Sequence, residues 1–125
     1  MYRNLLLVGA GSFIGGISRY LAQTFIQGRF PSSFPLGTLL VNISGCFIIG
    51  AVYGLAAKGN LLTPDIRLFL ATGICGGYTT FSSFAFEEVS LLNGGEWLYF
   101  SLYLALSILL GLGAAYLGSF LIRSL

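Results

Sequence analysis

The sequence has no histidine and very few charged residues. Only 8% of its 125 residues are Asp, Glu, Lys or Arg, whereas a soluble domain carries about 25%. Without histidine, and without a paired acid and base inside an apolar segment, nothing resembles a catalytic constellation, so we expect no enzyme. The sequence also lacks a nucleotide-binding motif and a basic cluster, and its net charge is only +2. These absences argue against ATP coupling by this chain and against nucleic-acid binding.

Apolar residues and glycine are abundant instead. Hydrophobic residues make up 56% of the chain, which also contains 18 glycines. Uncharged stretches cover residues 30–57, 68–86 and 97–122, and a further apolar run over 4–25 is interrupted only by Arg19. A bilayer crossing needs about 20 apolar residues. We therefore predict an all-α membrane protein with a single domain over 1–125 and transmembrane helices at 4–27, 36–57, 65–92 and 97–122.

Turn and cap residues separate these predicted helices. They comprise Pro35 before the second helix, Lys58-Gly59-Asn60 after it, Thr63-Pro64-Asp65 before the third, and Asn93-Gly94-Gly95 before the fourth. An even number of crossings places both termini on the same side. A small excess of Lys and Arg on that side favours a cytoplasmic N-terminus, but only weakly.

Small residues at four-residue intervals indicate where helices approach closely. The pairs are Gly11 with Gly15 and Gly50 with Gly54, and a third stripe consists of Ser107, Gly111 and Ala115. Close backbone contact is a main source of helix association in lipid. We expect most of these residues to pack within one subunit. Because so small a bundle has little room for a central pore of its own, we also expect an oligomer.

The third predicted helix has an interior that suits a helix poorly. Residues 73–84 read GICGGYTTFSSF, with adjacent glycines followed by four hydroxyl residues. Each glycine costs about 1 kcal/mol relative to alanine in a helix. A break here would free backbone groups that lipid cannot satisfy, and such breaks often form ion sites. An ordinary kink is the alternative; the density of oxygen atoms favours the ion site.

Neutral donors and aromatic rings lie close to this segment in the predicted spans. Phe81 and Phe84 would share a helix face, and their ring edges carry partial positive charge. The amide of Asn42 lies inside an apolar run, where it needs a hydrogen-bond partner. Tyr103 and Ser107 are one turn apart on the fourth helix. Packing or an interhelical hydrogen bond could explain each residue alone, but together they suit an anion that must be bound weakly and released.

The other polar and charged groups in the spans have ordinary explanations. Arg19 could extend along its helix to the interface, and Glu87 and Glu88 lie toward the far end of the third helix, where an interfacial position is common. Cys46 and Cys75 lack the spacing of a metal or redox site. We assign no ion-binding role to any of these five residues.

Three motifs together resemble the fluoride channel family called Fluc or CrcB. They are GICGGYTTFSSF at 73–84, GTLLVNISG at 37–45 and GGISRY at 15–20. The resemblance extends over the whole chain in length, order and spacing. Two departures are mild, because Ser83 replaces a usual threonine and Ser12 replaces a common glycine.

The resemblance implies a passive fluoride-selective channel in the bacterial cytoplasmic (inner) membrane. The expected assembly is an antiparallel, dual-topology homodimer with a broken third helix and two fluoride pores. The implied pore residues are Asn42, Phe81, Phe84, Tyr103, Ser107, Thr80 and Ser83. The resemblance also implies a structural sodium ion held by the backbone carbonyls of Gly76 and Thr79.

Two other functions remain as alternatives. A small multidrug-type transporter is also a four-helix membrane dimer, but it needs a buried carboxylate that the first helix lacks. A non-transporting assembly subunit would not need a polar break in its third helix. Fluoride and chloride efflux from liposomes would separate both alternatives from a channel.

Overall fold

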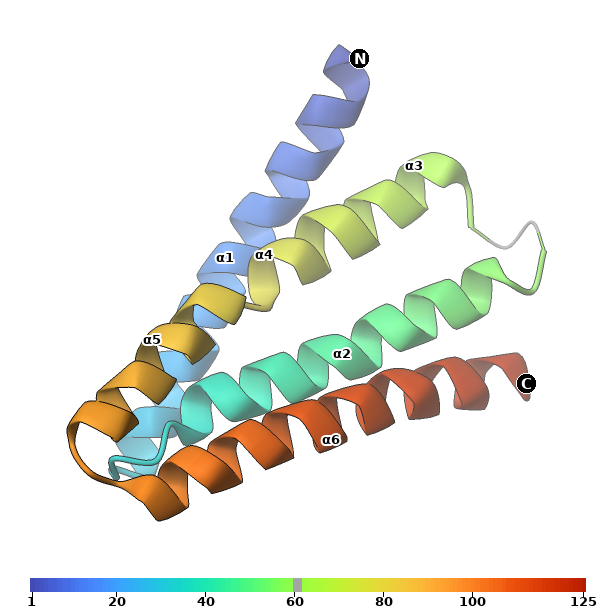
Figure 1. The fold of residues 1–125 in the computed structure, drawn as a ribbon. Coiled ribbons are helices and arrows are strands. Elements are labelled where there is room, and N and C mark those ends of the chain that lie inside the picture. The colour runs from blue at the N-terminus through green and yellow to red at the C-terminus, as the bar shows by residue number, and fades with distance from the viewer. Residues whose placement is uncertain (60–61) are drawn as a thin grey trace.

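The computed structural model describes residues 1–59 and 62–125, and its regular elements are all helical (Figure 1). In chain order they are α1 (Tyr2–Arg29), α2 (Leu36–Ala56), α3 (Pro64–Arg67), the π-helix η1 (Leu68–Cys75), α4 (Gly76–Tyr78), α5 (Phe81–Asn93) and α6 (Trp97–Arg123). The predicted all-α architecture is therefore confirmed. Asn60, part of the turn predicted after the second helix, lies outside the described residues.

The helix ends follow the predicted cap residues. Pro35 directly precedes α2, and the Thr63 side chain accepts a hydrogen bond from the backbone N–H of Ile66 at 3.2 Å, with Pro64 as the first residue of α3. Gly95 has a φ of 73°, in the left-handed region that favours glycine, and it lies between α5 and α6. The third predicted span, over 65–92 with a break inside it, is interrupted as expected. That region is divided into α3, η1, α4 and α5, with a wide π-helical turn that the sequence pattern did not predict.

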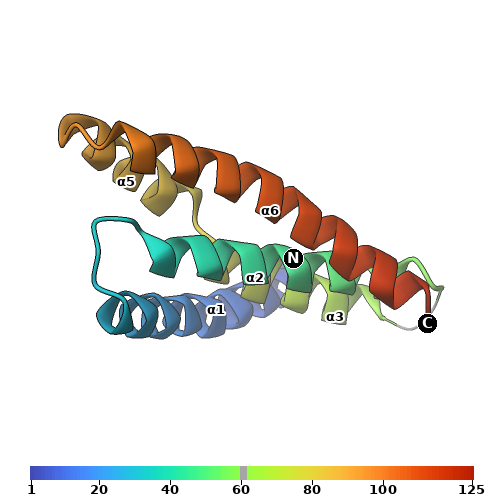
Figure 2. The same cartoon turned by 90° about the horizontal axis from the view of Figure 1, so that it is seen from below.

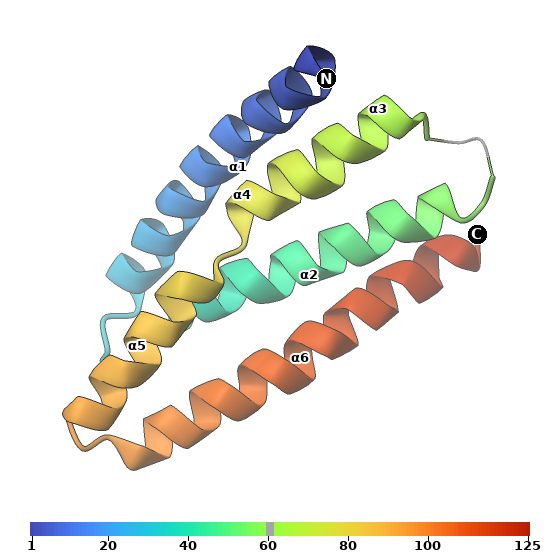
Figure 3. The same cartoon turned by 45° about the horizontal axis from the view of Figure 1, so that its top comes forward.

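The helices pack in two pairs. α2 lies against α6, and α1 lies against η1 and α4 (Figures 1 and 3). α2 lies between α1 and α6, as Figure 2 shows. Among the described residues, α5 packs mainly against α6 and touches α2 less. The regular pair is thus well packed, whereas the chain after the break is sparsely covered.

Glycines make both pairings possible. A Cβ atom added to Gly50 would lie 2.1 Å from the carbonyl oxygen of Ala115, and one added to Gly15 would lie 2.1 Å from the carbonyl oxygen of Ile74. Such distances leave no room for a side chain. The predicted packing of these glycines within one subunit is confirmed.

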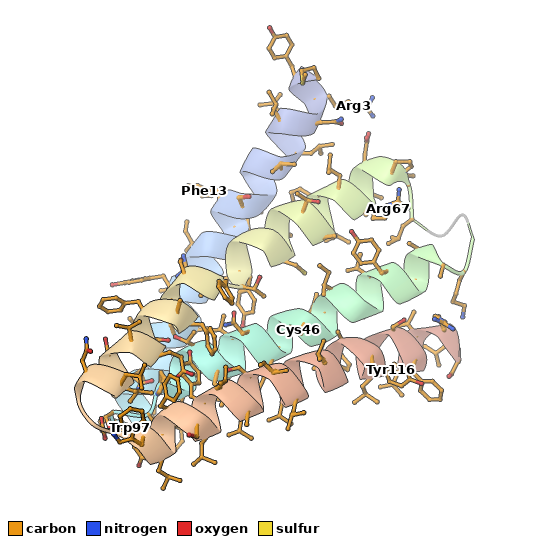
Figure 4. The ribbon with its side chains drawn as sticks, viewed as in Figure 1. Arg3, Phe13, Cys46, Arg67, Trp97 and Tyr116 are labelled. Atoms are coloured by element: carbon orange, nitrogen blue, oxygen red, sulfur yellow. The ribbon has the colours of Figure 1, made fainter. Side chains whose placement is uncertain are left out.

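The helices α1, α2 and α6 are each long and apolar enough to cross a membrane. Large apolar side chains project outward from the bundle rather than into it. In Figure 4, for example, Phe13 and Tyr116 point away from their helices, and they are 70% and 72% exposed. This pattern is that of a multi-pass membrane protein.

Side-chain contacts hold together the ends of the bundle. Arg3 forms an ion pair with Asp65 and joins the N-terminal end of α1 to α3. At the other end, the Ser33 hydroxyl donates a 2.7 Å hydrogen bond to Glu96, which joins the α1–α2 and α5–α6 loops.

Candidate functional site

The third region of the chain breaks between α4 and α5. Thr79 and Thr80 have extended backbones, with φ and ψ of −84° and 157° and of −149° and 117°. The side chain of Thr80 accepts a 3.1 Å hydrogen bond from the Ser83 N–H and so caps α5. The break predicted within 73–84 is confirmed, and it follows the adjacent glycines, which themselves remain helical.

Asn42 on α2 holds the broken backbone at two points. Its Oδ1 accepts a 2.8 Å hydrogen bond from the Thr80 N–H, and its Nδ2 donates a 3.0 Å hydrogen bond to the Thr80 carbonyl. The Thr80 N–H is therefore turned away from the Gly76 carbonyl, its partner in a regular helix. Because an amide nitrogen carries two hydrogens, one N–H of Asn42 is left after these contacts.

Arg19 also binds next to the break. Its Nε donates a 3.3 Å hydrogen bond to the carbonyl of Gly77, and its Nη1 donates a 3.1 Å hydrogen bond to Gln23 Oε1. The half-buried guanidinium thus bonds both to the backbone next to the break and to a side chain one turn further along α1. A charged donor on a carbonyl near a helix break satisfies a group that lipid would leave unpaired.

A pocket of about 420 Å³ opens beside the break. It brings together most of the residues predicted for the ion path, although their positions on the chain are far apart. Its lining comprises Asn42, Gly45, Cys46, Ile49, Cys75, Gly76, Thr79, Thr80, Phe81, Phe84, Ser107 and Ile108. Of the predicted pore residues, Tyr103 and Ser83 are not part of this lining.

Ser107 presents an unsatisfied hydroxyl at this pocket. Its Oγ is buried and has no hydrogen-bond partner among the described residues. A buried hydroxyl without a partner costs free energy. The side chain is therefore a candidate donor for something that the pocket receives.

Aromatic rings extend from the pocket into the bundle. The ring centroids of Phe81 and Phe84 are 5.7 Å apart, and those of Phe84 and Tyr103 are 5.0 Å apart. The two phenylalanines share one face of α5, as predicted. Phe81 is 79% exposed, whereas Tyr103 is fully buried. The Tyr103 hydroxyl donates a 2.7 Å hydrogen bond to Glu87 Oε1, so it is already paired.

A second, more polar pocket of about 500 Å³ lies toward the loop end that Ser33 and Glu96 join. Gln23, Thr38 and Glu87 line it, and sequence reasoning did not connect these residues. The only local signal was that Arg19 and Gln23 lie four residues apart on one helix face. Glu88, the neighbour of Glu87, is 6% exposed, and its carboxylate has no hydrogen-bond partner among the described residues.

Comparison with known proteins shows which family the chain belongs to. The chain matches the family described as CrcB-like protein, Camphor Resistance (CrcB), over residues 6–119. Relatives named "Fluoride-specific ion channel FluC" include one from Chlorobium phaeobacteroides strain BS1, 48% identical over 117 residues that cover 94% of this chain and 91% of that one. One from Chlorobium luteolum is 50% identical over 115 residues (92% and 88%), and one from Nitratidesulfovibrio vulgaris is 41% identical over 116 residues (93% and 94%). The resemblance inferred from the three motifs is confirmed, and this chain belongs to the CrcB family.

Proposed function

We propose that this chain forms a passive, fluoride-selective ion channel and has no enzymatic role. The observation that carries the proposal is the pocket beside the break, which joins Asn42, Phe81, Phe84 and Ser107 around an interrupted backbone. No charged side chain is among the described residues that line it. The shared name of the relatives supports fluoride as the ion.

The chemistry of the lining suits a small anion that must pass quickly. Fluoride accepts hydrogen bonds strongly, and the remaining N–H of Asn42 and the unpaired Ser107 hydroxyl can replace part of its water. The positive ring edges of Phe81 and Phe84 add weak attraction. Because neutral groups bind less tightly than a buried Lys or Arg would, the ion can leave again.

Three predicted pore residues have a less direct relation to the pocket. The Thr80 side chain caps α5 and also lines the pocket. Ser83 is bonded through its backbone to Thr80 and would act beside the path. Tyr103 would contribute through its ring, which packs on Phe84, while its hydroxyl is paired with Glu87.

The assembly that we propose is an antiparallel, dual-topology homodimer with two pores in the bacterial inner membrane. In each chain, the segments from α3 to α5 would form a fourth, interrupted crossing. The pocket is open in a single chain, and Phe81 beside it is 79% exposed. Lipid would leave the polar groups of the break unsatisfied, so a second copy would be a better cover for this side.

A structural sodium ion is consistent with the donors at the break. The Gly76 carbonyl has lost its helical donor, because the Thr80 N–H bonds to Asn42. Gly76 and Thr79 could offer neutral oxygens, which a hard cation accepts. Two carbonyls from one chain are fewer than the roughly six ligands that such a cation takes, so a second copy would have to supply more. Bound there, the ion would neutralise converging carbonyl dipoles and hold the two breaks together.

Anion efflux tests the function. Liposomes that contain the purified protein and are loaded with fluoride should release the fluoride without a proton gradient. The same liposomes loaded with chloride should retain the chloride. Release of both anions at similar rates would contradict fluoride selectivity. Cation movement driven only by a proton gradient would favour the multidrug-type transporter, and α1 contains no carboxylate to support that exchange.

Labelling tests the dual topology. Lys58 is exposed at one end of the bundle, so a cysteine there should be reached by a membrane-impermeant maleimide. With the two native cysteines replaced, we expect about half of the Lys58→Cys molecules to react from each side. Labelling from one side alone would mean that the small Lys and Arg excess fixes a single orientation.

A further inference from the structure

A continuous chain of hydrogen bonds connects the helix break to Tyr103 through all four long segments of the bundle. It begins at Arg19, whose Nη1 donates to Gln23 Oε1 at 3.1 Å. Gln23 Nε2 then donates to Thr38 Oγ1 at 2.6 Å, and Thr38 Oγ1 donates to Glu87 Oε2 at 2.8 Å. The Tyr103 hydroxyl donates to the other oxygen of Glu87 at 2.7 Å.

The chemistry of its members fixes the direction of donation along this chain of hydrogen bonds. A guanidinium can only donate, so the Gln23 amide must turn its oxygen toward Arg19 and its NH₂ toward Thr38. The Thr38 oxygen then accepts, and its single proton is directed to Glu87. An ionised carboxylate only accepts, so Tyr103 must donate to it. Each proton position follows from the one before it, and Gln23 is the step that transmits the direction from α1 to α2.

The backbone is built to bring Gln23 to this position. Gly37 precedes Thr38, and a Cβ atom added to it would lie 2.7 Å from the Gln23 carbonyl oxygen. The two helices therefore touch at this point, and the Gln23 side chain can reach Thr38 with a short hydrogen bond. Thr38 is 2% exposed, so water does not compete for its hydroxyl.

We propose that Gln23 is a positioning residue: by setting the direction of this hydrogen-bond chain it makes Thr38 donate to Glu87, and it thereby tunes the hydrogen bond that Tyr103 donates to the same carboxylate. Two neutral side chains, Gln23 and Thr38, separate Arg19 from Glu87. The effect on transport rests on the proposed fluoride function. Gln23 would affect transport through Tyr103, whose ring centroid lies 5.0 Å from that of Phe84 at the pocket. The hydrogen bond to Glu87 would hold the Tyr103 ring and hydroxyl in place.

The substitution Gln23→Glu breaks the direction with little change of shape. A carboxylate at this position still accepts from Arg19, but it can no longer donate to Thr38. The Thr38 proton is then drawn to residue 23, and Glu87 is left with Tyr103 as its remaining donor in the chain. Thr24→Glu is the control, since Thr24 follows Gln23 on α1 and lines the same pocket, while its hydroxyl donates to the Tyr20 and Leu21 carbonyls of its own helix.

The first measurement needs no ion transport. Carbon-13 NMR of the tyrosine Cζ atoms in the full-length protein reports the hydrogen bond of each hydroxyl, and Tyr103→Phe identifies the Tyr103 signal. We expect Gln23→Glu to move that signal and Thr24→Glu to leave it in place. A Tyr103 signal unmoved by Gln23→Glu would overturn the proposal.

The second measurement is a double-mutant cycle on fluoride efflux from liposomes. Gln23→Glu should slow efflux about fivefold or more in the parent, and less than about twofold in the Tyr103→Phe background, because residues in one network do not act independently. If Gln23→Glu slowed fluoride efflux by the same factor in both backgrounds, Gln23 would not act through Tyr103. If the parent releases no fluoride, the proposed function fails, while the NMR result still decides the role of Gln23.

Discussion

The α2–α6 pair and the segments from α3 to α5 show two different ways to use glycine in a membrane. Gly50 and Gly118 let two continuous helices touch, and an added Cβ would lie 2.1 Å and 2.2 Å from the opposite backbone. Gly76 has no such tight contact, since an added Cβ would lie 3.8 Å from the Ala71 carbonyl oxygen, and it instead precedes a break where Thr79 and Thr80 leave the helix. The first use gives rigid packing, whereas the second leaves polar groups that side chains from α1 and α2 must satisfy.

This contrast separates scaffold from site. The regular pair supplies a fixed surface on which Asn42 and Ser107 face the pocket. The broken region supplies the backbone groups and the aromatic rings. Changes in the pair should therefore affect folding first, and changes at the break should affect transport first.

The largest effect, on folding stability, is expected at the contact between α2 and α6. Gly50→Ala would place a methyl group against the Ala115 carbonyl, and overpacking of this kind typically costs about 1–3 kcal/mol. We expect much less folded protein and a lower midpoint of thermal unfolding in detergent. Gly113→Ala on α6 is the control, because nothing lies within 4 Å of its added Cβ. Equal stability of the two variants would show that the pair is not rigidly packed.

The next largest effect should be on fluoride efflux, from a change at the break that leaves the α2–α6 packing intact. Asn42→Asp keeps an acceptor for the Thr80 N–H but loses the donor to the Thr80 carbonyl, and it places oxygen against oxygen. It also puts an acid on the anion path. We expect fluoride efflux to fall at least tenfold, about 1.4 kcal/mol in barrier, while the protein still folds. Asn4→Asp, at an exposed position on α1, should leave the rate close to that of the parent; a similar loss there would mean that charge alone is responsible.

A small effect on stability is expected at the start of α3, where the broken region begins. Thr63→Ala removes the cap on the Ile66 N–H, which should cost about 1 kcal/mol of stability without slowing fluoride efflux. Thr63→Ser should restore the unfolding midpoint. Slower efflux in the alanine variant would mean that the pocket depends on the far end of α3.

Local patterns in the sequence were sufficient for the long helices α1, α2 and α6, the caps and the break. Helix ends depend on neighbouring residues such as Pro35 and Gly95, and an uninterrupted apolar run is visible without a structure. The poor helix formers at 76–83 likewise predicted the break. These features all rest on interactions between residues close together along the chain.

The hydrogen-bond partners could not be predicted in the same way. Glu87 and Tyr103 are 16 residues apart, and Gln23 and Thr38 are 15 apart, so only packing brings them together. Tyr103 was predicted to line the ion path, and the hydrogen bond from its hydroxyl to Glu87 is one that the sequence could not indicate. Cys46, to which we assigned no role, lies in the pocket lining.

The most direct test of the central claim compares two phenylalanines on α5. Phe84 lines the pocket, whereas Phe86, two residues further on, is 72% exposed and does not. Replacing either with isoleucine keeps apolar bulk but removes the positive ring edge. We predict that fluoride efflux from liposomes falls strongly in Phe84→Ile and stays near the parent rate in Phe86→Ile, with both proteins folded. Equal rates in the two variants would contradict the claim that the ion path runs along the broken region.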